Sequence, residues 1–253
     1  MDDLSLLAHV AAAGAAVGAG AVNAIAGGGT LISFPVLTAI GVPATNANAT
    51  NTVALCPGYI GGTHALRREL AATGEPLQAR LIVSAVGGVA GAAALLLTSD
   101  DAFRAVVPYL ILLSCLLLAV QDRVRSWLDR RGPSGGRLPL IELAGLFLAA
   151  VYGGYFGAGL GIMLIAVLGL FSAMPFNHLN AVKQPLAAAI NLAAAAFLVF
   201  SGRIEWSLVV VMAPSSLVGG QLGGRMSRRL DPHRFRWFVV AIGVVVALVY
   251  LVR

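Results

Sequence analysis

The chain contains a single lysine, Lys183, and it stands inside an apolar run that extends from about 177 to 200. An ionisable side chain within such a run is costly to place in lipid and indicates a functional position. No Asp or Glu lies between Glu142 and Glu205, so the counter-charge that we expect is an anionic substrate. The alternative is a lysine near a helix start whose side chain extends to the membrane interface.

Two polar clusters follow glycine-rich stretches, and each has the composition of an anion site. Unpaired N–H groups at the start of a helix attract anions, and glycine lets a ligand approach the backbone closely. The clusters open two long apolar runs, so their first turns would face the glycine-rich breaks. The residues that we expect to bind the substrate are Gly28, Gly29, Thr30, Asn48, Asn51, Thr52, Gly159, Gly161, His178, Asn180, Lys183 and Gln184.

Within these clusters, Asn48 and Asn180 could donate amide hydrogens from opposite sides of one central site, and His178 could carry a proton. The alternative is that the Thr and Asn residues are helix caps and turn residues after proline. That alternative explains less well why polar residues continue to Thr52 and Gln184, two turns into each apolar run.

Composition decides the class of protein that must position these residues. Of 253 residues, 58% are hydrophobic and only 11% are charged, whereas soluble domains carry about 25% charged residues. We therefore expect an all-α polytopic membrane protein. Runs long enough to cross a bilayer occur at roughly 4–25, 46–66, 77–98, 102–120, 138–158, 177–200, 206–226 and 235–252.

Two further apolar segments, 31–42 and 162–174, are too short for an untilted crossing. Backbone in hydrocarbon must satisfy its own hydrogen bonds, so a glycine break is tolerated only where it is buried in protein or lines a wet cavity. Short, Gly/Pro-interrupted segments at corresponding places in two halves of a chain are typical of transporter binding sites.

An internal repeat relates the two short segments. At a fixed offset of 132 residues and without gaps, Gly27 aligns with Gly159, Pro43 with Pro175, and the Phe-Arg pair at 103–104 with that at 235–236. The Gly-Gly-x-x-Gly motifs at 87–91 and 219–223 align as well, and we interpret them as sites of close helix packing. The repeat predicts a first transmembrane unit at 1–120, an Arg-rich cytoplasmic linker at 121–137 and a second unit at 138–253.

The distribution of arginine favours opposite orientations for the two halves. If the short segments do not cross, the halves are parallel and the 16 Arg divide 10 against 6 between the two sides. If each short segment crosses, each half has five membrane segments, the second half is inverted, and the division is 13 against 3. The positive-inside rule favours the inverted arrangement, with both termini outside.

Several classes of function are disfavoured. Cys56 and Cys115 lie in apolar segments without metal-ligand spacing, and no nucleophile–base motif or cofactor motif is evident, so we expect neither an enzyme nor a bound cofactor or metal. The net charge of +6 reflects Arg between apolar runs rather than nucleic-acid binding. The start Met1-Asp2-Asp3 lacks the basic region of a signal peptide, so we interpret the first run as a retained helix.

Three stretches resemble the TauE/SafE family: Gly-Gly-Gly-Thr-Leu-Ile-x-Phe-Pro at 27–35, Gly-Val-Pro at 41–43 and Ala-Thr-Asn-Thr at 49–52. The second-half Gly-x-Gly at 159–161 and the Asn-Ala-Val-Lys at 180–183 are similar to that family's repeat. The resemblance implies a secondary transporter of small sulfur-containing anions such as sulfite, thiosulfate or an organosulfonate like sulfoacetate. The substrate would bind between the halves near the bilayer midplane, with alternating access.

Two alternatives to this transporter stay open: an anion channel, and a transporter of another small carboxylate or organic anion. The expected location is the bacterial plasma (inner) membrane, where the chain would pass many times through the bilayer. A coupling ion, H⁺ or Na⁺, and assembly into a homodimer are compatible with the sequence.

Overall fold

The computed structural model describes residues 5–25, 27–131, 139–172, 174–226 and 232–252. In these ranges all regular structure is helical, which confirms the all-α prediction. Within the same ranges, five helices are long and apolar enough to cross a membrane, judged by length and composition. The elements are α1 Leu6–Ile25, α2 Thr30–Ala39, α3 Ala44–Ala65, α4 Arg67–Thr73, α5 Gln78–Leu97, α6 Asp100–Arg131, α7 Pro139–Tyr155, α8 Leu160–Phe171, α9 Phe176–Leu198, the 3₁₀ turn η1 Val199–Ser201, α10 Trp206–Met226 and α11 Pro232–Val252.

The helices of the two halves have corresponding neighbours, and two pairs of them begin at corresponding residues. The starts of α3 and α9 are 132 residues apart, as are those of α6 and α11. The contact between α1 and α10 corresponds in the repeat to the contact between α7 and α5. The contact between α3 and α10 likewise corresponds to the contact between α9 and α5. In addition, α3 packs on α9 and α6 on α11. Exchanging the halves therefore leaves this set of contacts unchanged, as approximate two-fold symmetry requires.

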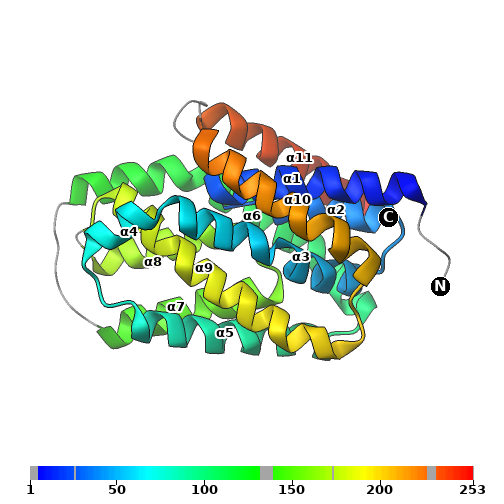
Figure 1. Cartoon of the computed structure of the whole chain (residues 1–253), viewed down its shortest axis with the longest axis horizontal. Helices are drawn as coiled ribbons and strands as arrows, with labels where there is room; N and C mark the ends of the chain where they lie inside the picture. The colour runs from blue at the N-terminus through cyan, green and yellow to red at the C-terminus, as the bar shows by residue number, and fades with distance from the viewer. Residues whose placement is uncertain (1–4, 26, 132–138, 173, 227–231, 253) are drawn as a thin grey trace.

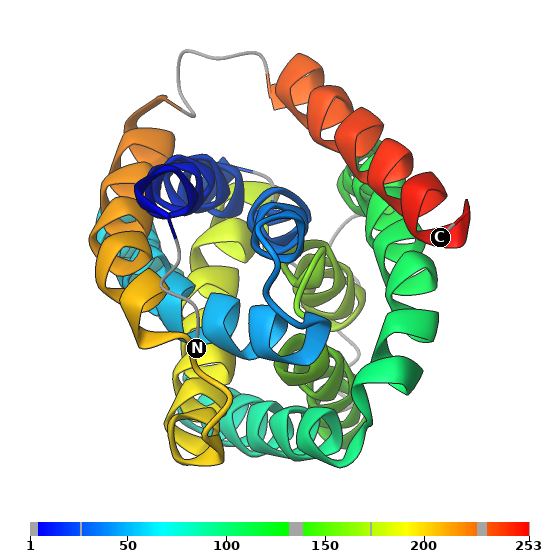
Figure 2. The same ribbon diagram turned by 90° about the vertical axis from the view of Figure 1, so that its right-hand side faces the viewer.

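Hydrogen bonds and the views of the molecule place several connections at one end. The Thr45 amide and hydroxyl each donate to the Asp100 carboxylate at 3.0 Å. The Glu205 amide donates to the Thr50 hydroxyl, also at 3.0 Å. The connections before α3, α6 and α10 therefore share an end, and both chain termini are marked at that end (Figure 2). In contrast, α7 begins at the opposite end from α1 (Figure 1).

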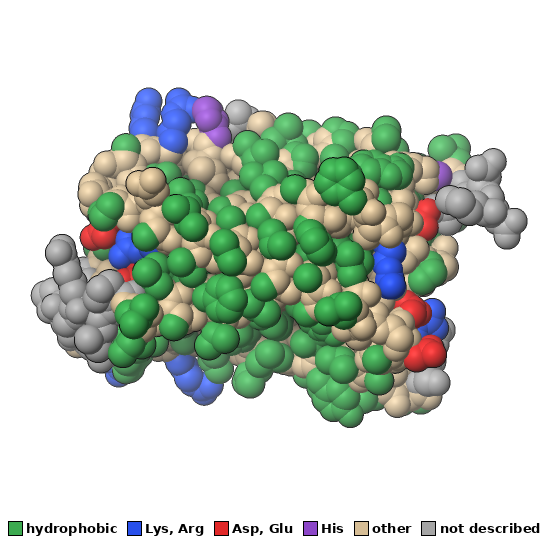
Figure 3. Space-filling model, turned by 90° about the horizontal axis from the view of Figure 1, so that it is seen from below, with side chains coloured by type: hydrophobic (Ala, Val, Ile, Leu, Met, Phe, Trp, Pro, Cys, Tyr) green, Lys and Arg blue, Asp and Glu red, His purple; other side chains and the backbone are tan. Residues whose placement is uncertain are grey.

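The outer surface has the polarity expected of a membrane protein. Figure 3 shows one face on which hydrophobic side chains cover the middle and charged side chains gather toward the two ends. Large apolar residues are exposed on many helices, for example Val210 at 71% and Leu148 at 68%. An exposed apolar belt is costly in water and favourable in lipid, so it indicates that the helices lie roughly across the bilayer.

Glycine allows the closest helix contacts between the halves. A Cβ on Gly91 of α5 would lie 2.0 Å from the Val151 carbonyl oxygen of α7. A Cβ on Gly219 of α10 would lie 2.1 Å from the Val17 carbonyl oxygen of α1. The interpretation of the two Gly-Gly-x-x-Gly motifs as packing sites is therefore confirmed, and close backbone approach of this kind is how helices associate in lipid.

An aromatic cluster holds the short helix α2 in the interior. The Phe34 ring is fully buried and packs edge-on against Phe103 of α6 and Phe156, with ring centroids 6.3 and 5.5 Å away. It also stacks on Tyr250 of α11 at 6.4 Å. Because these contacts reach both halves of the chain, they hold α2 in position relative to the second half.

Two features of the connections differ from the simplest expectation. The helix α6 continues through the first part of the predicted linker and ends at Arg131, and the remaining linker residues 132–137 lie outside the described residues. The connection after α3 contains a short helix, α4, that the hydropathy pattern does not indicate.

Candidate functional site

Two left-handed glycines form the breaks that precede the short helices. Gly27 has a φ of +83° and its counterpart in the repeat, Gly159, has a φ of +76°. Side chains of L residues rarely adopt this conformation, so glycine is required at both places. The breaks let the chain reverse between α1 and α2 and between α7 and α8, which directs the first turns of α2 and α8 into the interior.

The two breaks meet in the middle of the protein. A Cβ on Gly27 would lie 3.0 Å from the Gly161 Cα atom, and a Cβ on Gly161 would lie 3.2 Å from the Gly27 Cα atom. Any larger residue at either place would therefore push the backbones apart. The halves of the chain thus contact one another at their glycine breaks.

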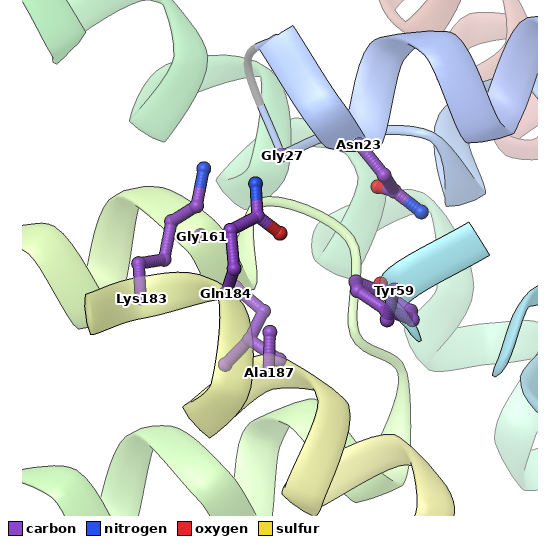
Figure 4. A pocket seen from close by; sticks show the side chains of 8 residues that line it. Asn23, Gly27, Tyr59, Gly161, Lys183, Gln184 and Ala187 are labelled. Atoms are coloured by element: carbon purple, nitrogen blue, oxygen red, sulfur yellow. The ribbon is translucent and has the colours of Figure 1, made fainter. Parts of the chain in front are cut away.

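A small cavity lies beside this contact, and Figure 4 shows its lining. The cavity is small, with room for about one water molecule. The helices that contribute to it come from both halves. Its lining residues are Asn23, Gly27, Tyr59, Leu160, Gly161, Lys183, Gln184 and Ala187.

Lys183 is the one cationic side chain of this lining. The residue is 2% exposed, so its ammonium does not extend to the membrane interface as the alternative interpretation required. Its Nζ atom lies 3.5 Å from the place of a Cβ on Gly161. Within the described part of the chain, the ammonium has no ion pair and no hydrogen bond. Binding of an anionic ligand would strongly stabilise a buried cation that has no protein partner.

The backbone amides at the two breaks are used differently. The Gly29 amide donates to the Asn23 Oδ1 atom at 2.7 Å. The corresponding amide, that of Gly161, has no hydrogen-bond acceptor among the described residues. The residue that corresponds to Asn23 in the second half is Tyr155, which has no amide oxygen in its side chain. The Gly161 amide is therefore left to face the cavity next to Lys183.

Gln184 adds a second unpaired donor. The residue is 2% exposed, and its Nε2 group has no hydrogen-bond partner in the described structure. Its Oε1 atom lies 3.1 Å from the place of a Cβ on Gly62, so a glycine in α3 makes room for this side chain. One ammonium and two N–H donors thus surround the cavity at its second-half side, and no carboxylate lines it.

The other nine predicted residues all lie outside the cavity lining. Some have partners inside the protein: Asn48 Nδ2 donates to the Tyr155 carbonyl at 2.7 Å, Thr52 to the Asn48 carbonyl at 2.9 Å, and Asn51 Nδ2 to the Thr30 hydroxyl at 3.5 Å. The remaining five are Gly28, Gly29, Gly159, His178 and Asn180, of which the last two are partly exposed. A direct role of these residues in binding stays a prediction.

Sequence reasoning missed Tyr59, whereas Asn23, a polar residue in an apolar run, was expected either to line the cavity or to bridge helices. Tyr59 is 7% exposed and Asn23 is 6% exposed, and both lie on the first-half side of the cavity (Figure 4). The missed signal was available in the repeat, because Tyr59 corresponds to Asn191 at the 132-residue offset and both are polar residues in apolar runs. Leu160 and Ala187 carry no such signal.

The described residues contain no group of three or more His, Cys, Asp or Glu that could hold a metal ion. The groups that the cavity offers to a ligand are the Lys183 ammonium and the N–H donors of Gly161 and Gln184. Such a site can hold and release a small anion.

Comparison with known proteins places this geometry in context. Residues 12–250 match the family model described as "Sulfite exporter TauE/SafE". The chain is 25% identical to the probable membrane transporter protein YfcA of Escherichia coli K12, over 90% of this chain and 84% of that protein. It is 31% identical to a probable membrane transporter protein of Haemophilus influenzae, over 81% and 79% of the two chains. It is 24% identical to the probable membrane transporter protein ORF9 of a Sinorhizobium species, over 91% and 87%.

Proposed function

Because the chain belongs to the TauE/SafE family of multi-pass membrane transporters, we propose that it is a secondary transporter of small sulfur-containing anions. The proposed substrates are sulfite, thiosulfate and organosulfonates such as sulfoacetate. The observation that carries the proposal is Lys183, a cation 2% exposed in the cavity where the two glycine breaks meet. The family's description names sulfite, and a site of donors without a carboxylate suits an oxyanion.

The substrate binds between the two halves near the bilayer midplane. Gly27 and Gly161 contact one another there, and each stands next to the start of a short helix. The positive end of a helix dipole attracts anions, so α2 and α8 both contribute favourably to the field at the cavity. Broken helices that meet at the midplane are a recurring form of transporter site.

The halves are inverted relative to one another in the membrane. The exchange symmetry of the helix contacts supports this arrangement. The arginine distribution supports it too, because Arg divides 13 against 3 if each short segment crosses and 10 against 6 if it does not. The end with the connections before α5 and α11 then faces the cytoplasm. Rocking of one inverted half against the other provides alternating access, and a cavity with room for about one water corresponds to a closed state.

The membrane is the bacterial plasma membrane, in keeping with the bacterial relatives. The coupling ion is H⁺ or Na⁺, and the protein acts as a transporter rather than as an enzyme. A homodimer is compatible with this function. An anion channel, or a transporter of a different small organic anion, remains the alternative function.

Uptake and binding measurements on Lys183→Gln test the proposal. In proteoliposomes, the wild-type protein should exchange labelled sulfite or sulfoacetate for unlabelled substrate without a sustained current. Lys183→Gln should abolish both binding and exchange because the ammonium is removed while the side-chain volume is nearly kept.

The matched control is Arg104→Gln, which removes a cation that is 58% exposed and paired with Asp100 at 2.7 Å. This variant should transport normally. Unchanged affinity of Lys183→Gln for every sulfur anion would refute the proposed site, and a sustained substrate current in the wild-type protein would favour the channel.

A further inference from the structure

Three buried polar side chains surround one point on the first-half side of the cavity. Tyr59 of α3, Asn191 of α9 and Asn23 of α1 are 7%, 5% and 6% exposed. Figure 4 shows Tyr59 and Asn23 on one side of the cavity and Lys183 on the other, with Gln184 between them. The two sides thus come from different helices and can act on different parts of one ligand.

The side chains of both asparagines lie within reach of the Tyr59 hydroxyl, and Asn23 lines the same cavity as Tyr59. The Asn23 Oδ1 atom already accepts the Gly29 amide at 2.7 Å, so the group that Asn23 turns toward Tyr59 is its Nδ2 donor (Figure 4). Asn191 uses one N–H to reach the Ala187 carbonyl at 2.8 Å and has a second N–H available. Both amides can therefore act as donors to the phenol oxygen.

A phenol has one O–H donor and can accept from two donors. With amide donors available to its oxygen, its own proton can be directed to an acceptor in the cavity. Tyr59 lines the cavity, and the lining contains no carboxylate. The amide oxygens of Asn23 and Gln184 also belong to the lining, but an oxygen of a bound anion carries more negative charge and is the better electrostatic match for the phenol O–H.

We propose that Tyr59 is a substrate-binding residue that donates a hydrogen bond to the anion from the side opposite Lys183. This inference rests on the proposed function, since it assigns a second contact in the same site. The ligand that fits is an oxyanion with acceptor oxygens in at least two directions, such as sulfite or a sulfonate, rather than a spherical halide. Asn23 and Asn191 act as positioning residues that orient the hydroxyl.

Tyr59→Phe is the direct test because it keeps the ring and removes the hydroxyl. A hydrogen bond to a charged ligand is worth enough that its loss should weaken sulfite and sulfoacetate binding roughly 10- to 100-fold. Weak binding of chloride should change little, because a spherical anion held by Lys183 does not need the second contact. Binding is measured by calorimetry on the purified protein in detergent.

The matched control is Tyr250→Phe, which removes a tyrosine hydroxyl that donates to Thr38 at 2.6 Å outside the cavity. This variant should bind sulfite with wild-type affinity. A purely structural role for Tyr59 predicts that Tyr59→Phe lowers the unfolding temperature and leaves the affinity of the folded protein unchanged, and that result would overturn the inference.

A second replacement covers the case in which Tyr59→Phe does not fold. 3-Fluorotyrosine at position 59 keeps the hydroxyl and makes it a stronger donor, so sulfite should bind more tightly, and equal or weaker binding would overturn the inference. Lys183→Gln distinguishes a failure of the Tyr59 contact from a failure of the proposed function. Loss of binding in that variant with no effect at Tyr59 refutes only the Tyr59 contact, whereas normal binding in Lys183→Gln refutes the proposed function.

Discussion

The two glycine breaks occupy equivalent places in the repeat, but only the first has hydrogen-bond partners from its own half. In the first break, Asn23 accepts the Gly29 amide at 2.7 Å, and Asn51 donates to the Thr30 hydroxyl at 3.5 Å. In the second break, the Gly161 amide has no acceptor within the described residues. The residue that corresponds to Asn51 is Lys183, which has no protein partner there.

This difference shows how a duplicated fold can divide its tasks. Both halves keep the left-handed glycine and the short helix, because without them the breaks could not meet. The side chains around them have diverged, so the first break is closed by hydrogen bonds and the second presents unpaired donors to the cavity. The comparison assigns a mainly structural role to the first break and a mainly chemical role to the second.

The comparison is tested most severely by exchanging the residues at 51 and 183. Lys183→Asn should lower sulfite affinity by about 3–5 kcal/mol, as expected when one member of a buried charge pair is lost. The double variant Asn51→Lys/Lys183→Asn should still not bind sulfite. The Gly29 amide, which is the counterpart of the Gly161 amide, already donates to Asn23. Both are measured by calorimetry and proteoliposome uptake.

Recovery of binding in the double variant would contradict the division of tasks. It would mean that a cation anywhere near the centre of the protein is sufficient for anion binding and that the unpaired Gly161 amide contributes nothing to the affinity. A useful reference is Asn51→Ala alone, which should retain binding because its side chain lies outside the cavity lining.

Alanine at the two equivalent glycines should have different consequences. A Cβ on Gly29 would lie 2.1 Å from the Ala19 carbonyl oxygen, a backbone atom that cannot move independently. Gly29→Ala should therefore destabilise the protein by about 3 kcal/mol, at the upper end of the usual cost of overpacking. Thermal unfolding in detergent measures this effect.

Gly161→Ala should act on binding more than on folding. Its Cβ would lie 3.1 Å from the Cδ atom of the flexible Lys183 side chain and 3.2 Å from the Gly27 Cα atom. The Gly27 backbone would have to shift by only a few tenths of an ångström, which is far less than the 2.1 Å contact at Gly29 demands. The displaced ammonium should weaken sulfite binding about tenfold, equivalent to about 1.4 kcal/mol. Equal losses of stability in both alanine variants would show that the two breaks serve the same purpose.

Asn23 links the first break to the cavity, because it accepts the Gly29 amide and also lines the cavity. Asn23→Ala leaves the buried Gly29 amide without its acceptor and should cost about 1–3 kcal/mol of stability. Asn23→Asp keeps an oxygen for the amide, so the fold should survive, but its negative charge beside the cavity should weaken sulfite binding. If Asn23→Asp binds sulfite as well as the wild type does, the cavity is not the anion site.

The helices and their repeat could be predicted well from the sequence. Glycine and proline at a constant offset of 132 residues identified the breaks, and Pro43 and Pro175 preceded α3 and α9 as expected. These features are local, because a left-handed glycine or a helix start depends on neighbouring residues. The extension of α6 to Arg131 was not predicted, because hydropathy marks where a helix leaves the apolar region rather than where it ends.

The site was predicted only in part. Lys183 stood out because a single ionisable residue in an apolar run is rare, and Gly161 and Gln184 followed from the repeat. Tyr59 was missed because a tyrosine in an apolar segment is usually a packing residue, and its role depends on Asn23 and Asn191 from other helices. Whether a polar side chain binds a ligand or forms a hydrogen bond within the protein also depends on tertiary contacts. Asn48 is an example, because it donates to the Tyr155 carbonyl.

Asn48 and Asn180 give the smallest and most discriminating effects. From the sequence alone, each should donate to the substrate and each alanine variant should weaken binding equally. In the structure, Asn48 is fully buried and donates to the Tyr155 carbonyl at the second break at 2.7 Å, whereas Asn180 is partly exposed.

Asn48→Ala should therefore destabilise the protein by about 1 kcal/mol, and Asn180→Ala should change stability by less than about 0.5 kcal/mol. Thermal unfolding without substrate, followed by sulfite titration, separates stability from binding. A tenfold loss of affinity in both variants at unchanged stability would restore the symmetric site. A loss confined to the stability of Asn48→Ala would mean that this asparagine supports the second break from the first half, which is the asymmetry that the two breaks already display.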